Sequence, residues 1–279
     1  EESSESLHFM ADKFGHYLER HRHLRFPHKH SFYHLVYFTK AAGRHSIDFV
    51  DFDAKPGQIY FMNPGQVHTW SFKGTIEGYI INFSAVFLQQ LIADTRYLDQ
   101  FAFFKSIAGD QVIQVPAKKH AALEQLFKII LTEQADKQEF NEDFIRTSLL
   151  QILFQVARST VHRHSTQQNN YNALLFQNFR RLIDEHYVAK KLVRDYAAML
   201  YITPNHLNAL SKDVGGRPAG EMIRDRILLE AKRRLVNADM KIAAIAADLA
   251  FEDNSYFTKF FKKYEGLTPQ EFRKQFIKN

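Results

Sequence analysis

The sequence predicts an α+β protein in two parts, an antiparallel β-barrel with two amphipathic helices followed by an all-α domain. Short aromatic and β-branched runs separated by Gly and Pro turns fill residues 32–84. Apolar residues then recur at helical spacing to the end of the chain. The net charge of +6 resides entirely in residues 172–279, with 19 Lys and Arg against 13 Asp and Glu. We therefore expect a cationic surface on the second part only.

The composition excludes several classes of protein. A chain of 279 residues with 45% apolar side chains suits two ordinary domains with buried cores. It has no cysteine, which excludes disulfides, thiolate catalysis and Cys-based metal sites. The opening EESSES is unlike a signal peptide, and no apolar run approaches about 18 residues. We expect a soluble, cytoplasmic protein that has no membrane partner.

The barrel prediction covers residues 20–116 within a first domain of residues 1–163. HLVYFTK, SIDFVDF, QIYFM, HTWSF and GYIINF are strand-like, and AAG, KPG, NPG and KGT break them. Many short strands with no helical period between them are typical of an antiparallel barrel or a jelly roll.

Two amphipathic helices should follow within residues 118–161. Their broad apolar stripes could pack on the barrel or form a seam between two copies. We favour the seam, and hence a homodimer, because two helices outside a closed barrel carry more apolar surface than one face covers. Residues 164–171 are polar, lack a period and suit a linker.

The segment 192–216 predicts a first helix-turn-helix unit. Thr203 is the expected N-cap of its second helix, and Pro204 occupies the first helical position. Gly215 and Gly216 should end this helix. Its outward positions are Asn205, His206, Asn208, Ala209 and Lys212.

The segment 241–266 repeats the design. Asp253 should cap the second helix and Gly266 should end it. A long helix from Pro218 to about Val236 would join the two units at a fixed spacing. The outward positions are Asn254, Ser255, Tyr256, Lys259, Lys262 and Lys263.

This arrangement indicates double-stranded DNA as the partner of residues 172–279. Two second helices on one frame could enter successive major grooves, about 34 Å apart. Asn and Ser can bond base edges, and Lys can hold phosphates. The alternative is a helical bundle whose polar faces simply meet solvent, but the duplication, the caps and the localised charge favour DNA binding.

Residues 172–279 resemble the DNA-binding domain of the AraC/XylS family of bacterial transcription regulators. The resemblance rests on IAAIAADLAFEDNSYFTKFFKKYEGLTPQEFR, with its F-x-x-F-F-K-K and G-x-T-P-x-x-F-R runs. It implies that Asn205, Asn208 and Ala209 face bases in the first unit, and Asn254, Ser255 and Lys259 in the second. Two residues depart from the pattern. Ala209 stands where relatives often carry Arg, and Ala250 replaces a common Gly, which we expect to be harmless.

The N-terminal half resembles the cupin-type sensing domain of the same family. FPHKHSFY, GRHSIDF and PGQIYFMNPGQVHTW carry this resemblance. In metal-binding cupins such motifs supply metal ligands, here matched by His28, His30 and His68, with His34 in place of a Glu. Four imidazoles could hold Zn, Ni, Cu or Fe. We nevertheless expect no cofactor, because the family's sensing domains mostly bind small molecules without metal.

The favoured interpretation is an effector pocket formed by His28, His30, His34, Lys40, His68 and Trp70. Lys40 and Trp70 fall where a sugar-sensing relative has pocket residues, so the resemblance implies a sugar as one effector. Aromatic rings can stack on a sugar face, and Lys40 can bond hydroxyls.

The sequence thus predicts a dimeric transcription regulator with no enzymatic activity, controlled by a small effector and able to contact RNA polymerase. One alternative is a constitutive DNA binder with a purely dimerising barrel. Another is a cupin metalloenzyme fused to a DNA-binding domain, which would require a bound metal with an open position.

Overall fold

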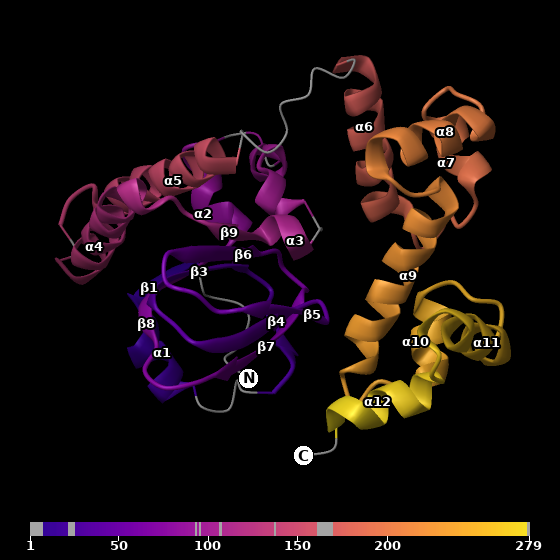
Figure 1. Cartoon of the computed structure of the whole chain (residues 1–279), viewed down its shortest axis with the longest axis horizontal. Coiled ribbons are helices and arrows are strands. Elements are labelled where there is room, and N and C mark those ends of the chain that lie inside the picture. The colour runs from indigo at the N-terminus through magenta and orange to yellow at the C-terminus, as the bar shows by residue number, and fades with distance from the viewer. Residues whose placement is uncertain are drawn as a thin grey trace. The chain divides into compact units, whose positions relative to one another are not determined.

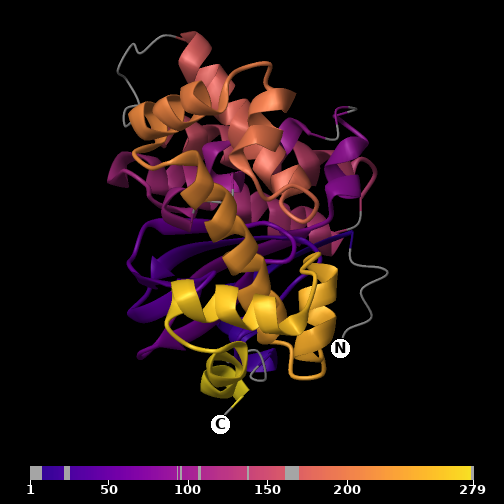
Figure 2. The ribbon, with the colours of Figure 1, turned by 90° about the vertical axis from the view of Figure 1, so that its right-hand side faces the viewer.

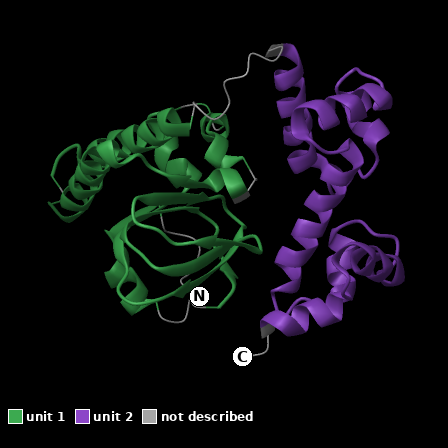
Figure 3. Ribbon diagram, in the orientation of Figure 1, with its two compact units in different colours: residues 1–165 green, residues 166–279 purple. Residues whose placement is uncertain are grey.

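The computed structural model describes residues 8–21, 26–92, 94, 96–105, 108–136, 138–160 and 170–277. The chain forms two compact units, residues 1–165 and 166–279 (Figure 3). The expected linker at 164–171 lies almost wholly outside the described residues. No helix in the described ranges is long and apolar enough to cross a membrane.

The first unit contains two antiparallel sheets (Figure 1). One has the strand order β1-β8-β3-β6-β9 and the other β2-β7-β4-β5. The strands are β1 (Phe9–Lys13), β2 (His28–Lys29), β3 (Tyr33–Lys40), β4 (Gly43–Ile47), β5 (Val50–Asp53), β6 (Gln58–Met62), β7 (Val67–Phe72), β8 (Glu77–Phe83) and β9 (Val112–Gln114).

The predicted antiparallel β-domain followed by two helices is confirmed, but as two facing sheets rather than as a closed barrel. No strand pairing between the two sheets occurs in the described part of the chain, so they face one another as two layers. A barrel needs hydrogen bonds continuing around every edge. The four-stranded sheet ends at β2 and β5, short strands of two and four residues, and neither pairs with the other sheet among the described residues. The β-region also begins at β1, before the expected start near residue 20.

Helices and helical turns complete the first unit. The long pair α4 and α5 agrees with the predicted amphipathic helices, and α4 packs along α5 (Figure 1). These elements are α1 (Phe14–Arg20), α2 (Ala85–Gln89), η2 (Tyr97–Gln100), η3 (Ala102–Phe104), α3 (Ala108–Gln111), η4 (Ala117–Lys119), α4 (His120–Asp136) and α5 (Asn141–Thr160).

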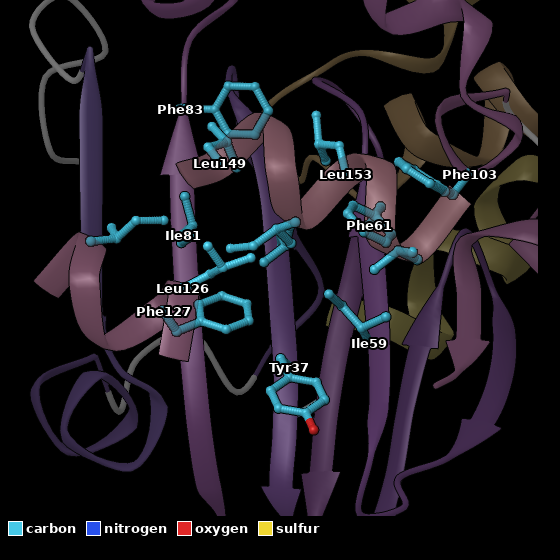
Figure 4. Close-up of a cluster of buried hydrophobic side chains, with 14 of the residues drawn as sticks. Tyr37, Ile59, Phe61, Ile81, Phe83, Phe103, Leu126, Phe127, Leu149 and Leu153 are labelled. Carbon is cyan, nitrogen blue, oxygen red and sulfur yellow. The ribbon is translucent and has the colours of Figure 1, made fainter. Parts of the chain in front are cut away.

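Two apolar cores hold this unit together. One lies between the five-stranded sheet and the α4–α5 pair, where Leu149 and Leu153 face Ile81 and Phe61 (Figure 4). The other lies between the two sheets and is rich in aromatic side chains, with Phe38, Tyr60 and Trp70 among its members. Burying each large apolar side chain contributes about 1.5–3 kcal/mol.

The backbone of Ala11 in β1 is bonded by an amide side chain from α4. Its N–H donates to Gln134 Oε1 at 2.7 Å, and its carbonyl accepts from Gln134 Nε2 at 2.9 Å. The side chain therefore bonds the backbone as a neighbouring strand would, and it ties α4 to the sheet.

The second unit is all-helical, as predicted. The long helix α9 runs as one rod between the two helix-turn-helix units (Figures 1 and 2). Its helices are α6 (Asn170–His186), α7 (Val193–Met199), α8 (Pro204–Gly215), α9 (Ala219–Leu235), α10 (Ile242–Asp248), α11 (Asn254–Glu265) and α12 (Pro269–Ile277).

Candidate nucleic-acid interface and ligand cavity

The start and end of α8 are fixed by its sequence, as expected. Thr203 Oγ1 accepts from His206 N–H at 3.2 Å, and Pro204 needs no partner for its missing N–H. Gly216 ends the helix with φ +70°, a left-handed conformation that glycine adopts without strain. With Leu207 and Leu210 buried, the opposite face is exposed to solvent. That face carries Asn205, His206, Ala209 and Lys212.

Asn208 differs from the other residues expected to face bases. It is half-buried, and its Oδ1 accepts from the backbone N–H of Ala219 at 3.2 Å. Ala219 is the first residue of α9, where backbone N–H groups have no partner within the helix. The Asn208 oxygen therefore fastens α8 to the start of α9.

Helix α11 repeats the geometry of α8. Asp253 Oδ1 accepts from Tyr256 N–H at 2.7 Å, and Gly266 ends the helix with φ +78°. Phe257 and Phe261 are fully buried on the inner face. All the expected outward positions are exposed, namely Asn254, Ser255, Tyr256, Lys259, Lys262 and Lys263.

The turns of the two helix-turn-helix units match as well. Each first helix is followed by a residue with positive φ, Tyr201 at +56° and Ala250 at +51°. In each case the next residue donates back to the first helix, Ile202 N–H to Ala197 and Phe251 N–H to Ala246. Ala250 is thus not a neutral departure, because a left-handed conformation strains a residue that has a Cβ.

The cations of α9 are largely neutralised within the unit. Arg226 pairs with Asp184 at 2.9 Å, Arg234 with Asp248 at 2.6 Å, and Lys232 with Glu265. No ion pair among the described residues holds the lysines of the exposed faces, Lys212, Lys259, Lys262 and Lys263. Four lysines on the outer faces of α8 and α11 are therefore available to a polyanion, three of them on α11.

In the first unit a hydrogen-bonded chain runs between the sheets. Trp70 Nε1–H donates to the Tyr60 hydroxyl at 3.0 Å. That hydroxyl lies 3.3 Å from His34 Nε2, and His34 Nδ1 lies 2.8 Å from Asn82 Oδ1. The chain is consistent if His34 donates from Nδ1 to Asn82 and accepts at Nε2. Both ring nitrogens are then engaged within the protein, and His34 lies outside the converging group of His28, His30 and His68.

Three of the expected histidines do come together. Candidate ligand nitrogens of His28, His30 and His68 lie within 4.8 Å of one another, with His30 Nε2 3.0 Å from His68 Nε2. His28 Nδ1 donates to the Phe26 carbonyl at 2.7 Å, which directs the Nε2 lone pair toward the cluster. Three imidazole nitrogens, one of them oriented by the bond to the Phe26 carbonyl, suit a transition metal.

Burial keeps the rings of His30, His34 and His68 neutral. Together with the neighbouring imidazoles, it lowers the pKa of His30 to about 2. Burial likewise lowers the pKa of His34 to about 3 and holds the pKa of His68 well below its usual value. Neutral imidazole is the form that binds metals and that exchanges hydrogen bonds with uncharged ligands.

Trp70 also lines a cavity of about 610 Å³ beside the histidines. This volume is in the range of small-molecule sites. Lys40 lies apart from it, exposed at the end of β3 and 3.6 Å from Glu77. The cavity is formed by α1, β7 and the turn before β8, through Gly15, Leu18, Glu19, His21, Trp70, Ser71, Phe72, Gly74, Thr75 and Ile76.

Sequence reasoning missed two contributors to this region. His45 is buried and stacks on Tyr60, with ring centroids 4.6 Å apart. Helix α1 supplies one wall of the cavity. The alternation in GRHSI places His45 on the same face of β4 as the buried Ile47, which was the available signal. The seven residues of α1 offer too short a pattern to identify.

The apolar stripes of α4 and α5 are buried within the chain itself. Leu123, Ile130 and Leu149 are fully buried. The dimer seam was favoured because one surface was expected to be too small to cover both helices, and this burial removes that argument. Phe144 and Phe154 stay exposed on α5, at 55% and 39%.

Comparisons with known proteins agree with both halves of this description. The family model described as an AraC-like ligand binding domain matches residues 11–153, slightly more than half of the chain. A helix-turn-helix domain model matches residues 196–275.

Individual relatives match mainly over part of their length. The HTH-type transcriptional regulator YijO of Escherichia coli is 32% identical over 102 residues, covering 37% of this chain and 36% of that protein. The regulatory protein PocR of Salmonella typhimurium is 31% identical over 99 residues, covering 36% and 33%. The chain thus spans about a third of the length of these relatives.

A solved structure aligns over the whole chain. ToxT from Vibrio cholerae O395 covers 98% of this chain and 100% of its own, with 13% identity and a TM-score of 0.45. The two family models together account for the sheets with their helix pair and for the duplicated helix-turn-helix units. The chain belongs to the AraC family of transcriptional regulators.

Proposed function

We propose that this chain is a sequence-specific DNA-binding regulator whose first unit binds a small-molecule effector. The observation that carries the proposal is the matched pair of capped helices, α8 and α11, with exposed polar faces on one frame. Asn205 and Ser255 occupy equivalent positions from which side chains can bond base edges. The lysines of α11 that hold no ion pair attract DNA phosphates, and this attraction precedes the contacts with base edges.

The proposed effector site is the cavity lined by Trp70. The residues that line it include the aromatic Trp70 and Phe72 and the polar Ser71, Thr75 and Glu19. Rings with adjacent hydroxyl and carboxylate groups suit a polyhydroxylated molecule, and a sugar is the proposed class. Of the six residues expected to form the effector pocket, Trp70 is among those that line this cavity. Lys40 and the histidines at 28, 30, 34 and 68 are not, so the proposed site differs from the expected one.

Regulation would follow from linkage between the two units. An effector changes DNA affinity only if it binds one arrangement of the protein better than another. In this proposal the protein is a cytoplasmic homodimer that acts at promoters and contacts RNA polymerase. The exposed Phe144 and Phe154 of α5 are the proposed dimer contacts.

A second candidate effector is a divalent transition metal. The cluster of His28, His30 and His68 supports it, because its neutral nitrogens converge within 4.8 Å. Bound metal would fix β2 against β7, the strands that carry His28 and His68. Under this second proposal the protein is a metal-responsive regulator without catalytic activity.

The full chain tests both candidates in one experiment. Its melting temperature is measured with a panel of sugars and with Zn²⁺, Ni²⁺ and Cu²⁺, each with and without chelator. A ligand that binds only the folded state raises the melting temperature as its concentration rises. A shift with a sugar that Trp70→Ala removes supports the cavity. A chelator-sensitive shift that His68→Ala removes supports the metal.

The DNA arm uses duplexes selected from a random pool by the full chain. Preference for selected over scrambled duplex, and a change of that affinity with effector, support the proposal. Equal affinity for both duplexes would overturn sequence-specific binding. Affinity that no ligand changes would instead favour the constitutive alternative.

A further inference from the structure

We propose that Lys191 is a positioning residue that clasps the two helix-turn-helix units in one relative orientation. Its consequence for DNA rests on the proposed function, whereas the clasp itself is a property of the second unit. Lys191 lies just before α7, in the first helix-turn-helix unit. Its partners lie in the turn between α10 and α11, in the second.

The contacts of Lys191 require a long cationic side chain that donates hydrogen bonds. Its ammonium donates to the carbonyl of Ala250 at 2.5 Å and lies 3.9 Å from the centre of the Phe251 ring. Glu252, the next residue, adds electrostatic attraction. The Lys191 ammonium thus interacts with three consecutive residues of one turn. The first accepts a charge-assisted hydrogen bond, the second makes a cation–π contact, and the third attracts it with a carboxylate.

The acceptor is a backbone group that the local fold holds in place. Ala250 has the left-handed conformation, and its N–H bonds to Ala247 while the N–H of Phe251 bonds to Ala246. These bonds fix the direction of the Ala250 carbonyl relative to α10. The position of the Lys191 ammonium is therefore tied to α10, and through the turn to α11.

The clasp adds a second path between the units. The first path is α9. Arg226 and Asp184 tie it to α6, which packs on the first helix-turn-helix unit, and Arg234 and Asp248 tie it to α10 of the second helix-turn-helix unit. A rod alone permits bending and rotation of the units about its axis. A contact that joins Lys191 directly to Phe251 closes a loop of structure and opposes both movements.

Half-burial of the ammonium supports this role. Lys191 is only partly exposed, and burial lowers the pKa of its side chain. The ring that the ammonium contacts belongs to a buried residue, Phe251, and a cation–π contact gains strength where the ring is removed from water. The adjacent Lys190 is exposed and offers a matched control one position away.

Orientation matters because both reading helices must reach the same duplex. Free movement between α8 and α11 would have to be lost on binding to successive grooves. A pre-set orientation reduces that cost for a bipartite site. Weak, sequence-independent contact by one helix at a time should gain nothing from it.

The test exploits the absence of cysteine in the chain. Ala198 in α7 and Ala247 in α10 are exposed at equivalent positions of the two units. Spin labels on Ala198→Cys and Ala247→Cys report the distance distribution between the units by pulsed electron resonance. Labelled full-length protein is diluted with unlabelled chain, so that only distances within one chain are measured.

Lys191→Met should broaden or shift this distribution, because it keeps the stem length but loses the charge and donors. Lys190→Met should leave it unchanged, and Lys191→Arg should largely restore it. Phe251→Leu, which removes only the ring face, should give a smaller change. A Lys191→Met distribution identical to that of the parent would overturn the clasp, as would an equal effect of Lys190→Met.

The DNA measurement separates positioning from general stability. Lys191→Met should lower affinity for the selected duplex about tenfold and leave affinity for the scrambled duplex nearly unchanged. An equal loss on both duplexes would overturn a positioning role. If no duplex is preferred by the parent, the proposed function fails, and the spin-label distances still decide the clasp.

Discussion

The indole of Trp70 is hydrogen-bonded to the hydroxyl of Tyr60, with Nε1 3.0 Å from the oxygen. Trp70 lines the cavity, while Tyr60 is fully buried and reaches His34. A molecule that displaces the indole would therefore disturb a chain of hydrogen bonds that crosses to the five-stranded sheet. This gives the cavity a physical connection to the interior of the first unit.

The Trp70–Tyr60 bond should be measurable as a coupling energy. We expect Trp70→Phe and Tyr60→Phe to be less costly together than the sum of the single variants, by about 1 kcal/mol. The measurement is the free energy of unfolding by denaturant for the four proteins of the cycle. Strict additivity would mean that the bond contributes nothing to stability.

The buried histidines predict a loss of stability in acid. Burial lowers the pKa of His34 to about 3 and that of His45 to about 4, so the unfolded chain binds their protons first. Their contribution is complete above about pH 6.5, the pKa in the unfolded chain, and is lost progressively as the pH falls from there toward the folded values. Each of the two histidines should lower the free energy of unfolding by about 2 kcal/mol between pH 7.5 and pH 5.

Denaturant unfolding at the two pH values tests this prediction. His45→Phe keeps a ring stacked on Tyr60 but cannot titrate, so it should lose less stability between pH 7.5 and pH 5. An unchanged pH dependence in this variant would assign the acid sensitivity to other groups.

Asn205 and Asn208 should separate in function although both lie on α8. Asn208→Ala removes the acceptor for Ala219 N–H and should lower the free energy of unfolding by about 0.5–2 kcal/mol. Asn205→Ala should leave stability nearly unchanged, because its side chain is exposed, and should weaken binding to selected DNA. Melting curves and DNA titrations of both variants check this pair.

Glycine should stabilise the turn of either helix-turn-helix unit. Tyr201 has φ +56°, and its side chain is 96% exposed, so Tyr201→Gly relieves strain without removing packing. We expect a gain of about 1 kcal/mol in the free energy of unfolding. Tyr201→Ala is the control, since it keeps a Cβ in the same conformation and should give no comparable gain.

Lys259 should contribute to the recognition of bases rather than to the sequence-independent attraction of phosphates. Lys259→Ala should weaken binding to the selected duplex by about 1–3 kcal/mol and affect the scrambled duplex less. Lys263→Ala is the comparison, because a phosphate contact would weaken both duplexes alike and reduce the salt dependence. Equal losses with Lys259→Ala would remove its base-reading role.

Local signals allowed much of the second unit to be predicted. The caps Thr203 and Asp253 and the terminating Gly216 and Gly266 act within a few residues, so the sequence pattern contains them. Asn208 lay on the expected helix, but its partner Ala219 belongs to another helix, and no periodicity reveals such a contact.

The first unit was harder to predict for the same reason. The pairing of β1 with β8 joins Phe9 to Phe83, and five residues of strand give little signal for a partner so distant. Two facing sheets and a closed barrel share the same alternation of side chains, and only edge pairing distinguishes them. Likewise, sequence spacing suggested the four histidines, but hydrogen bonds separated His34 from the other three.

The amide of Gln134 has a consequence for the behaviour of the protein at high concentration. β1 is an edge strand, and an edge with open N–H and C=O groups invites strand addition by another chain. Gln134 already satisfies both groups of Ala11. Another strand therefore cannot pair with β1 at Ala11, and the contact from α4 opposes aggregation through this edge.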